Sequence, residues 1–348
     1  MLTSDQNRKI NEIVEEFKEA ADFYRMEYSE DLMGMFRDFG CMLLLKCKVD
    51  TEGKADLERL LEGRHKLKGT VKRQLMTVSE ELAQLWAPGE QDGSGDTGEY
   101  EGSQNVREMF QTALEEIFHF CLYSKGGKNR YLLPEETAKP LLRLLTFPEG
   151  MMAGNEGLVV LDTQCGAGSA LMAASRYLKN LRLMGYEKDE EMWAAAVIMS
   201  QLSGLEMELH LEDGARADLY ESCDLVISNP VYGTDTIKDE ELIDQLPGEL
   251  KTVRGRYHME LIRSMQALNF DGKAMLIVPN SFLFANRTES MKVRKWLLQS
   301  YSLEAIISLP EDTFMYSGVR SGVMVFSKPF MSGGWEGHTQ RVLYYNLE

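Results

Sequence analysis

From Leu158 onward the chain alternates between short aliphatic segments and segments with apolar residues at helical spacing. The aliphatic segments are 158–162, 181–187, 207–213, 224–230, 274–280, 303–310 and 322–329, and the helical segments are 169–180, 189–204, 257–269 and 290–300. Strands that alternate with helices form a mostly parallel sheet with helices on both faces. The last two strands follow each other without a helix, which predicts an antiparallel end hairpin. We therefore expect an α/β fold.

The N-terminal part of the chain has a different pattern. Residues 5 to about 86 carry apolar side chains at helical spacing, and these include Ile10, Ile13, Val14 and Phe17. The segment from about 87 to 104 is rich in glycine and acidic residues and lacks periodicity, which predicts a mobile loop. A further helix is expected over about 105–123. We predict a helical N-terminal domain over 1–125 and a second domain over 126–348.

The charge balance limits how the chain can bind nucleic acid. Its 348 residues include 38 lysines and arginines against 55 aspartates and glutamates, which gives a net charge of −17. Proteins that grip DNA alone usually present a basic surface, because neutralised phosphates supply much of the affinity. Any contact with DNA is therefore expected to be local or to depend on a partner.

The cysteines and the apolar runs indicate a cellular location. The five cysteines are odd in number and form no C-x-x-C pair. This favours reduced thiols in the cytoplasm over a disulfide framework or a zinc site, so no metal is expected. The N-terminus lacks the apolar core of a signal peptide, and no apolar run approaches the length of a membrane-spanning helix.

Polar residues follow the first strands of the predicted sheet. The first strand ends in D-x-x-C-G-x-G, with Asp162, Cys165, Gly166 and Gly168. By itself this glycine pattern is also typical of a tight turn between a strand and a helix. Glycines let the backbone approach a ligand closely, and the start of the following helix is partly positive.

The next two strands add carboxylates at the same edge. Glu187 lies about 20 residues after the glycines, where such folds hold a ribose by its hydroxyl groups. Asp213 follows the third strand and could bind an adenine amino group or cap its own loop. Together these residues predict a site for a nucleoside ligand.

The fourth strand ends in N-P-V-Y, residues 229–232. This ending, after the glycine turn, resembles that of S-adenosylmethionine-dependent amino-methyltransferases, whose pattern is Asn/Asp-Pro-Pro-Tyr/Phe. The resemblance implies that the Asn229 side chain and the Pro230 carbonyl accept hydrogen bonds from the target amine. Tyr232 would stack on an extruded base. The alternative is that Asn229 is a turn residue and Tyr232 a lid over the core.

A longer resemblance covers roughly residues 120–328. The segments GRYHMELIRSM, VPNSFLF, RKWLLQ, ISLPEDTF and GVMVFSKP occur in the order found in modification (M) subunits of type I restriction–modification systems. The resemblance implies a class I, Rossmann-like methyltransferase domain that binds S-adenosyl-L-methionine and methylates adenine N6 in DNA. It also implies a specificity subunit as a possible partner, and the charge balance predicts only weak binding of DNA by this chain alone.

The chain departs from the family pattern at a few positions. Leu133 stands where the family has a threonine that helps to hold the methionine end of the cofactor. Thr163 replaces the proline usual after Asp162, and Val231 replaces the second proline of Asn-Pro-Pro-Tyr, which removes a backbone restraint. These departures leave open a catalytically silent homologue that binds the cofactor and acts as an interaction module. A protein glutamine methyltransferase is a further alternative, because such enzymes also use Asn-Pro-Pro-Tyr.

Two further segments allow more than one interpretation. The basic stretch 63–73 could touch phosphate or form a solvated helix face. The long connection that follows Tyr232 could gate the substrate or could simply be mobile.

Overall fold

The computed structural model describes residues 2–28, 31–50, 55–62, 67, 69–86, 97–124, 132–145, 157–220, 222–233, 235–284, 286–314, 318–328 and 341–347. The chain divides into two compact units. The first comprises Met1–Lys128 together with Val197–Leu205, and the second comprises Asn129–Ala196 together with Glu206–Glu348.

The described part of the first unit is helical, as its apolar spacing predicts. Its helices are α1 (Ser4–Tyr28), α2 (Leu32–Lys46), α3 (Ala55–Glu62), α4 (Gly69–Ala83) and α5 (Thr97–Tyr123). Asp31 caps α2 by accepting a hydrogen bond from the backbone N–H of Met33. Phe17 of α1 meets Phe39 of α2 edge to face, with ring centroids 5.0 Å apart. Such contacts between apolar stripes form the core of this unit.

Helix α5 begins at Thr97, so the prediction of a loop that continues to about residue 104 is wrong for residues 97–104. The rest of that predicted loop, residues 87–96, lies outside the described residues. Gly98 and Gly102 each cost a helix about 1 kcal/mol relative to alanine, which is why the segment does not resemble a helix. Extending an existing helix adds one hydrogen bond per residue, so a long helix can continue through such weak positions.

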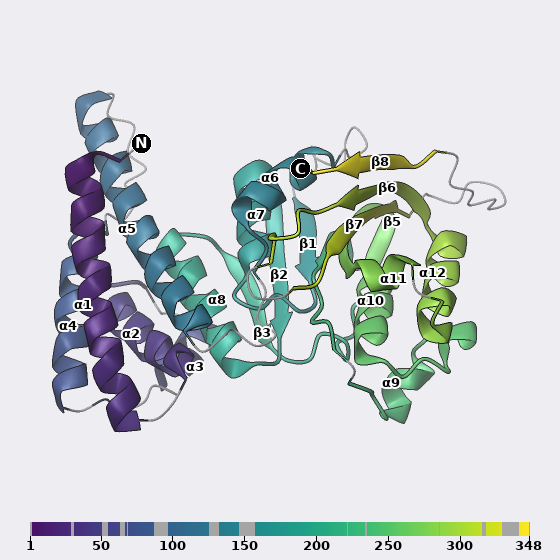
Figure 1. The fold of residues 1–348 in the computed structure, drawn as a ribbon, viewed down its shortest axis with the longest axis horizontal. Helices are drawn as coiled ribbons and strands as arrows, with labels where there is room; N and C mark the ends of the chain where they lie inside the picture. Colours follow the sequence, from purple (N-terminus) through teal and green to yellow (C-terminus); the bar gives the residue numbers. More distant parts are fainter. Residues whose placement is uncertain are drawn as a thin grey trace. The chain divides into compact units, whose positions relative to one another are not determined.

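The second unit is built on an eight-stranded sheet with the order β3-β2-β1-β4-β5-β7-β6-β8 (Figure 1). The strands are β1 (Leu158–Asp162), β2 (Leu181–Glu187), β3 (Met207–Leu211), β4 (Cys223–Ser228), β5 (Leu268–Pro279), β6 (Ser302–Ser308), β7 (Ser321–Ser327) and β8 (Leu343–Asn346). The first five strands are parallel, and β7 runs antiparallel to both β5 and β6. The predicted parallel sheet and the antiparallel β6–β7 pair are therefore confirmed.

Strand β8 extends the sheet beyond that pair and was not predicted. It pairs in parallel with β6, from Ala305 with Leu343 to Ser308 with Asn346. All of its residues are exposed, so it lacks the alternation of apolar and polar side chains that marks a half-buried strand. The sheet therefore ends in a parallel pair rather than in the antiparallel one.

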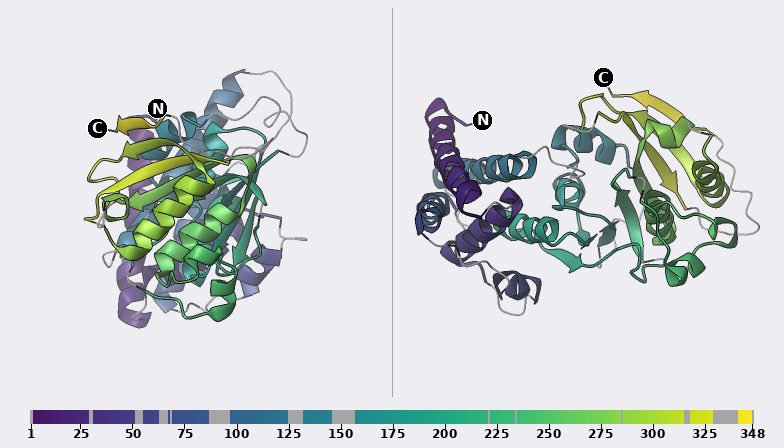
Figure 2. Two further views of the ribbon diagram at one scale, coloured as in Figure 1. Left: turned by 90° about the vertical axis from the view of Figure 1, so that its right-hand side faces the viewer. Right: turned by 60° about the horizontal axis from the view of Figure 1, so that its bottom comes forward.

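Helices cover both faces of this sheet (Figure 2). The connections are α6 (Glu135–Arg143), α7 (Ser169–Tyr177), α8 (Glu190–Ser203), α9 (Glu240–Asp244), α10 (Arg256–Gln266), α11 (Asn280–Phe284) and α12 (Thr288–Ser300). Helix α7 packs on β1 and β2, whereas α10 and α12 contact each other on the opposite face. Among the described residues, no helix combines the length and apolar character needed to cross a membrane.

The arrangement of the strands defines one edge where ligands can bind. Because β1, β2, β3 and β4 are parallel, their carboxyl ends lie along the same edge of the sheet. The strand order reverses between β1 and β4, which are hydrogen-bonded neighbours. Open α/β sheets bind ligands outside the carboxyl ends of the strands at such a reversal.

Candidate active site

The residues predicted from the first two strand ends lie together. The backbone N–H of Gly166 donates a hydrogen bond of 2.9 Å to Glu187 Oε2, and the N–H of Asp189 donates one of 2.7 Å to Oε1. The carboxylate of Glu187 thus joins the turn after β1 to the end of β2. Burial raises the pKa of Glu187, while its hydrogen bonds to backbone N–H groups oppose the shift.

The turn after β1 requires glycine at both predicted positions. Gly166 has a φ of +56° and Gly168, the N-cap of α7, has a φ of +79°. Residues with a Cβ atom rarely adopt this left-handed conformation. A Cβ added at Gly166 would lie 3.5 Å from the Met192 Cε atom, an ordinary van der Waals distance, so the φ angle rather than crowding favours glycine here.

Asp162 and Cys165 are both buried beneath this turn. Asp162 is 2% exposed, and its Oδ1 accepts a hydrogen bond of 3.0 Å from the backbone N–H of Gln164. Burial raises the pKa of Asp162 to about 7, and the nearby Glu187 carboxylate adds to the shift. Burial also raises the pKa of the Cys165 thiol, which therefore stays protonated. The Cys165 backbone N–H donates to the Tyr186 carbonyl oxygen, so this residue holds the turn on β2.

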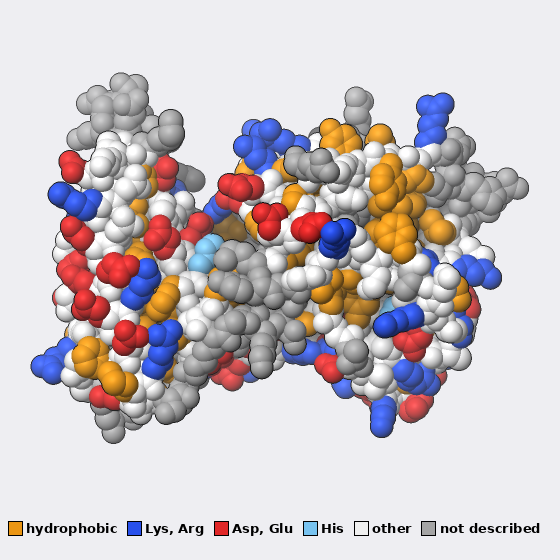
Figure 3. All heavy atoms as spheres, in the orientation of Figure 1, with side chains coloured by type: hydrophobic (Ala, Val, Ile, Leu, Met, Phe, Trp, Pro, Cys, Tyr) orange, Lys and Arg blue, Asp and Glu red, His pale blue; other side chains and the backbone are white. Residues whose placement is uncertain are grey.

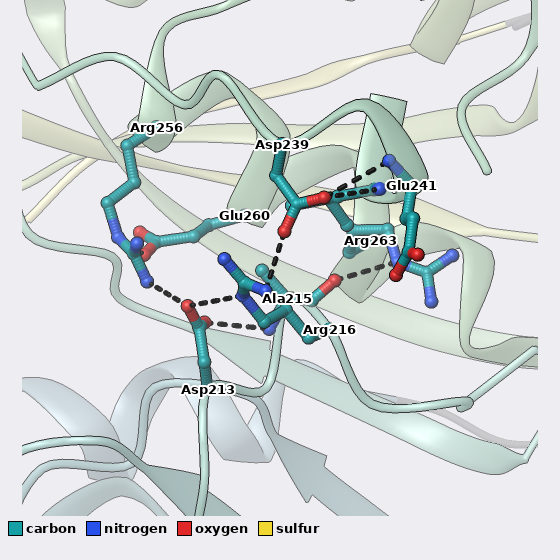
Figure 4. Close-up of polar contacts among 9 residues, drawn as sticks. Asp213, Ala215, Arg216, Asp239, Glu241, Arg256, Glu260 and Arg263 are labelled. Carbon is teal, nitrogen blue, oxygen red and sulfur yellow. Dashed lines mark hydrogen bonds and ion pairs between the residues drawn. The ribbon is translucent and has the colours of Figure 1, made fainter. Parts of the chain in front are cut away.

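Asp213 lies at the same edge but already has partners of its own (Figure 4). Its Oδ1 accepts a hydrogen bond of 3.2 Å from the backbone N–H of Ala215, which is the loop cap that the sequence left as an alternative. Its Oδ2 accepts one of 2.8 Å from Arg256 Nη2 and lies 3.8 Å from Arg216 Nε. The ion pair with Arg256 joins the end of β3 to the start of α10.

Gly214 is a residue of this edge that the sequence analysis missed. A Cβ atom placed on it would overlap the Thr163 carbonyl oxygen and lie 2.8 Å from the Tyr186 Cβ atom. The glycine therefore lets the loop after β3 pack directly on the turn after β1. The only local signal was a glycine immediately after Asp213, which by itself is common in turns.

The N-P-V-Y segment follows β4, next to β1 at the reversal of strand order. Asn229 is half-buried, Pro230 is buried and Val231 is 42% exposed. Tyr232 is half-buried, and its hydroxyl lies 3.4 Å from Ser321 Oγ at the start of β7. The segment is therefore placed beside the turn that contains Asp162 and Gly166.

Tyr257 supports this segment and was also missed. Its ring meets that of Tyr232 edge to face, with centroids 5.7 Å apart, and meets Phe282 in the same way at 5.8 Å. The Tyr257 hydroxyl is buried and has no hydrogen-bond partner among the described residues, and burial raises its pKa well above the usual value. Its position at the first turn of α10 is not marked by any local pattern, because the contact depends on how α10 packs.

Two of the residues that depart from the family pattern, Leu133 and Thr163, make buried local contacts. The side chain of Leu133 is buried, and its backbone N–H donates a hydrogen bond of 3.2 Å to Ser169 Oγ at the start of α7. The Thr163 hydroxyl is buried and hydrogen-bonded to the Ser264 hydroxyl on α10. It also accepts a hydrogen bond from Gln164 Nε2. Thr163 thus links the turn after β1 to α10, a connection that a proline could not make.

Two curated proteins are similar to this chain in sequence. A type I restriction enzyme methylase subunit (MjaVII) from Methanocaldococcus jannaschii is 24% identical over 298 residues, which are 78% of this chain and 47% of the relative. A type II restriction enzyme and methyltransferase (RM.BcgI) from Heyndrickxia coagulans is 26% identical over 213 residues, 56% of this chain and 31% of the relative. The chain thus spans less than half the length of these curated relatives.

A solved structure shares the fold of the chain over nearly its whole length. The solved relative comes from Listeria monocytogenes and is described as a class I S-adenosylmethionine-dependent methyltransferase. The two structures align with a TM-score of 0.69 at 17% identity, over 98% of this chain and 93% of the other. The predicted class I methyltransferase fold is therefore confirmed. A model of the N-6 DNA methylase family matches residues 107–348, the greater part of the sequence. The chain belongs to the N-6 DNA methylase family.

Proposed function

We propose that the chain is an S-adenosylmethionine-dependent methyltransferase that acts on N6 of adenine in DNA, as the modification subunit of a restriction–modification system. The observation that carries this proposal is the position of residues 229–232. They follow β4 directly beside β1, whose end carries the glycine turn and Asp162. A methyl donor and a target amine would therefore meet at the reversal of strand order.

The residues at this edge suit S-adenosyl-L-methionine. Asp162, Glu187 and Asp213 offer carboxylate oxygens to the ammonium, hydroxyl and amino groups of such a ligand. Gly166 carries no side chain, which lets a ligand approach its backbone closely. A positive charge next to Asp162 would favour its ionised form and lower its raised pKa. When bound, the cofactor supplies an electrophilic methyl group.

The residues after β4 would orient the target base. An exocyclic amine conjugated to a ring is a weak nucleophile, so its nitrogen must be held toward the methyl group. The Asn229 side-chain oxygen and the Pro230 carbonyl oxygen would accept its hydrogen bonds, and the partly exposed ring of Tyr232 would stack on the extruded base. The proton is released to solvent after transfer, and positioning supplies most of the rate enhancement.

Replacing Asn229 tests the assignment. Asn229→Ala is expected to abolish methyl transfer while cofactor affinity stays within about 2-fold, because the side chain faces the target rather than the donor. Asn229→Asp retains an acceptor oxygen and is the matched control, for which we expect partial activity. The measurements are N6-methyladenine by mass spectrometry, in unmethylated DNA with and without the neighbouring gene products, and calorimetric titration of the cofactor. Wild-type turnover by Asn229→Ala would refute the catalytic role.

A catalytically silent homologue is the second candidate. It is favoured by Leu133, whose buried aliphatic side chain cannot form the hydrogen bond expected of a threonine. Val231, which is 42% exposed, also leaves the backbone after Pro230 less restrained. Cofactor binding by the wild type without N6-methyladenine, in the presence of the neighbouring gene products, would favour this candidate.

A further inference from the structure

The segment that follows Tyr232 is a closed and packed loop. Its two ends pair with each other, through a bridge between Thr236 and Gly255 and a hydrogen bond of 2.8 Å from the Ile237 N–H to the Arg254 carbonyl oxygen. Apolar side chains along the loop are buried in the core of the second unit, namely Ile237, Leu242, Ile243, Leu246, Leu250 and Val253. Residues 235–255 therefore form a packed loop, closed at its two ends, soon after the candidate catalytic segment.

Ion pairs tie this loop to the turn after β3. Arg256, which follows the loop, donates from Nη2 to Asp213 Oδ2 at 2.8 Å, and Arg216 Nη1 lies 2.6 Å from Asp239 Oδ2 within the loop. Figure 4 shows Arg256 approaching Asp213 from one side and Arg216 from the other. The side chains of Asp213 and Arg256 are only 19% and 21% exposed, so solvent screens this pair less than a surface pair.

Arg256 uses two different groups of its guanidinium at once. While Nη2 binds Asp213, Nε donates a hydrogen bond of 2.7 Å to Glu260 Oε1 on the next turn of α10. Glu260 is 4% exposed and fixes the direction of the guanidinium plane. A lysine, with a single ammonium on a flexible stem, could not reproduce this fork.

The Asp213 carboxylate retains capacity for a ligand. Its Oδ1 accepts from the Ala215 N–H and its Oδ2 from Arg256, with Arg216 Nε also 3.8 Å from Oδ2, whereas a carboxylate offers about four acceptor sites. An adenine amino group could therefore bind the same carboxylate without displacing Arg256. In that case the ligand and the loop would share one anchoring residue.

We propose that Arg256 is a positioning residue that couples occupancy of the adenine end of the cofactor site to the order of residues 235–255. This inference rests on the proposed function, because it takes Asp213 as the adenine-binding carboxylate. A bound amino group holds Asp213 in one orientation, which strengthens its pair with Arg256 and so stabilises the loop. Coupling between two sites is reciprocal, so loss of Arg256 must also weaken ligand binding.

Hydrogen–deuterium exchange of the full chain tests this coupling, with S-adenosylhomocysteine as a non-reactive probe. In the wild type, saturation with the probe is expected to slow amide exchange in residues 235–255 by about 5-fold or more. In Arg256→Gln this ligand-dependent slowing is lost and the dissociation constant rises by a similar factor. Lys251→Gln is the matched control. It removes an ion pair with Asp244 within the same loop and leaves Asp213 untouched, so it should behave like the wild type.

Each outcome decides the inference. If the role of Arg256 is purely structural, Arg256→Gln will raise the amide exchange rate of residues 235–255 without the probe but keep the slowing that the probe causes. That result would overturn the coupling and leave the proposed function untouched. No binding of the probe by the wild type would contradict both. If Arg256→Gln does not fold, Arg256→Lys keeps the positive charge and should fold but lose the coupling. Full coupling in Arg256→Lys would overturn the role of the guanidinium fork.

Discussion

Asp162 is a buried carboxyl whose hydrogen bond partner, the Gln164 N–H, comes from its own turn. A buried carboxylate without a neighbouring cation is costly, so the group keeps its proton to higher pH than it would in an unfolded chain. This explains why its pKa is raised to about 7. The same burial keeps the Cys165 thiol protonated, so the turn after β1 holds no reactive thiolate.

The raised pKa of Asp162 predicts a pH dependence of stability. Because the folded state binds this proton more tightly than the unfolded chain, the stabilising contribution is complete below about pH 4 and is lost as the pH rises to about 7. The side chain is 2% exposed, and the loss is expected to be of the order of 2–4 kcal/mol. Asp162→Asn keeps an acceptor for the Gln164 N–H but cannot ionise. Urea titrations between pH 4 and 7.5 should show a smaller decline for this variant, and identical slopes would contradict the assignment.

At the scale of the elements, Gly214 fixes how the turn after β3 packs on the turn after β1. Gly214→Ala places a methyl group against the Thr163 carbonyl oxygen, which is backbone and cannot rotate away. We expect a loss of about 1–3 kcal/mol in the free energy of unfolding, the usual cost of overpacking. The matched control is Gly248→Ala, because a Cβ at Gly248 meets no atom within 4 Å. Urea titration measures the free energy of unfolding of each variant. An equal loss in Gly214→Ala and Gly248→Ala would contradict the close packing at Gly214.

The elements themselves were largely predictable from the sequence, whereas the contacts between them were not. Buried strands such as β1 and β4 are short aliphatic runs that end in polar residues, so their positions and the edge that carries Asp162 and Asn229 followed from local pattern, although β4 ends at Ser228 rather than at residue 230. Strand β8 escaped prediction because it is held by backbone pairing with β6 while its side chains stay exposed. The contact between Arg256 and Asp213 joins residues far apart in the chain, and no spacing rule encodes it.

At the scale of the whole molecule, acidic side chains outnumber basic ones, and the net charge is −17. On the face shown in Figure 3, the described lysines and arginines are scattered among acidic side chains rather than gathered in one patch. Partial burial and the nearby Glu81, Glu19 and Glu12 raise the pKa of Glu16 on α1. Such a mixture of charges gives the face shown in Figure 3 no concentrated basic patch for a phosphate backbone.

The described part of the basic stretch 63–73 includes two exposed cations. Residues 63–66 and 68 lie outside the described residues, but Lys72 and Arg73 are exposed on α4. Their side chains point into solvent, as the alternative of a solvated helix face predicts. A phosphate backbone could reach them only as part of a larger contact.

Weak binding of DNA by the isolated chain is therefore the expected behaviour. With a net charge of −17, we predict dissociation constants for duplex DNA near the non-specific range of about 10⁻⁴–10⁻⁶ M, with little dependence on sequence. Specificity would then come from another subunit, since specific interfaces are usually strongly basic. Fluorescence anisotropy with duplexes of mixed sequence, near physiological salt, measures this directly. The double variant Lys72→Gln, Arg73→Gln should weaken the residual binding further, whereas nanomolar and sequence-selective binding by the wild type would mean that this chain itself contains the surface that recognises bases.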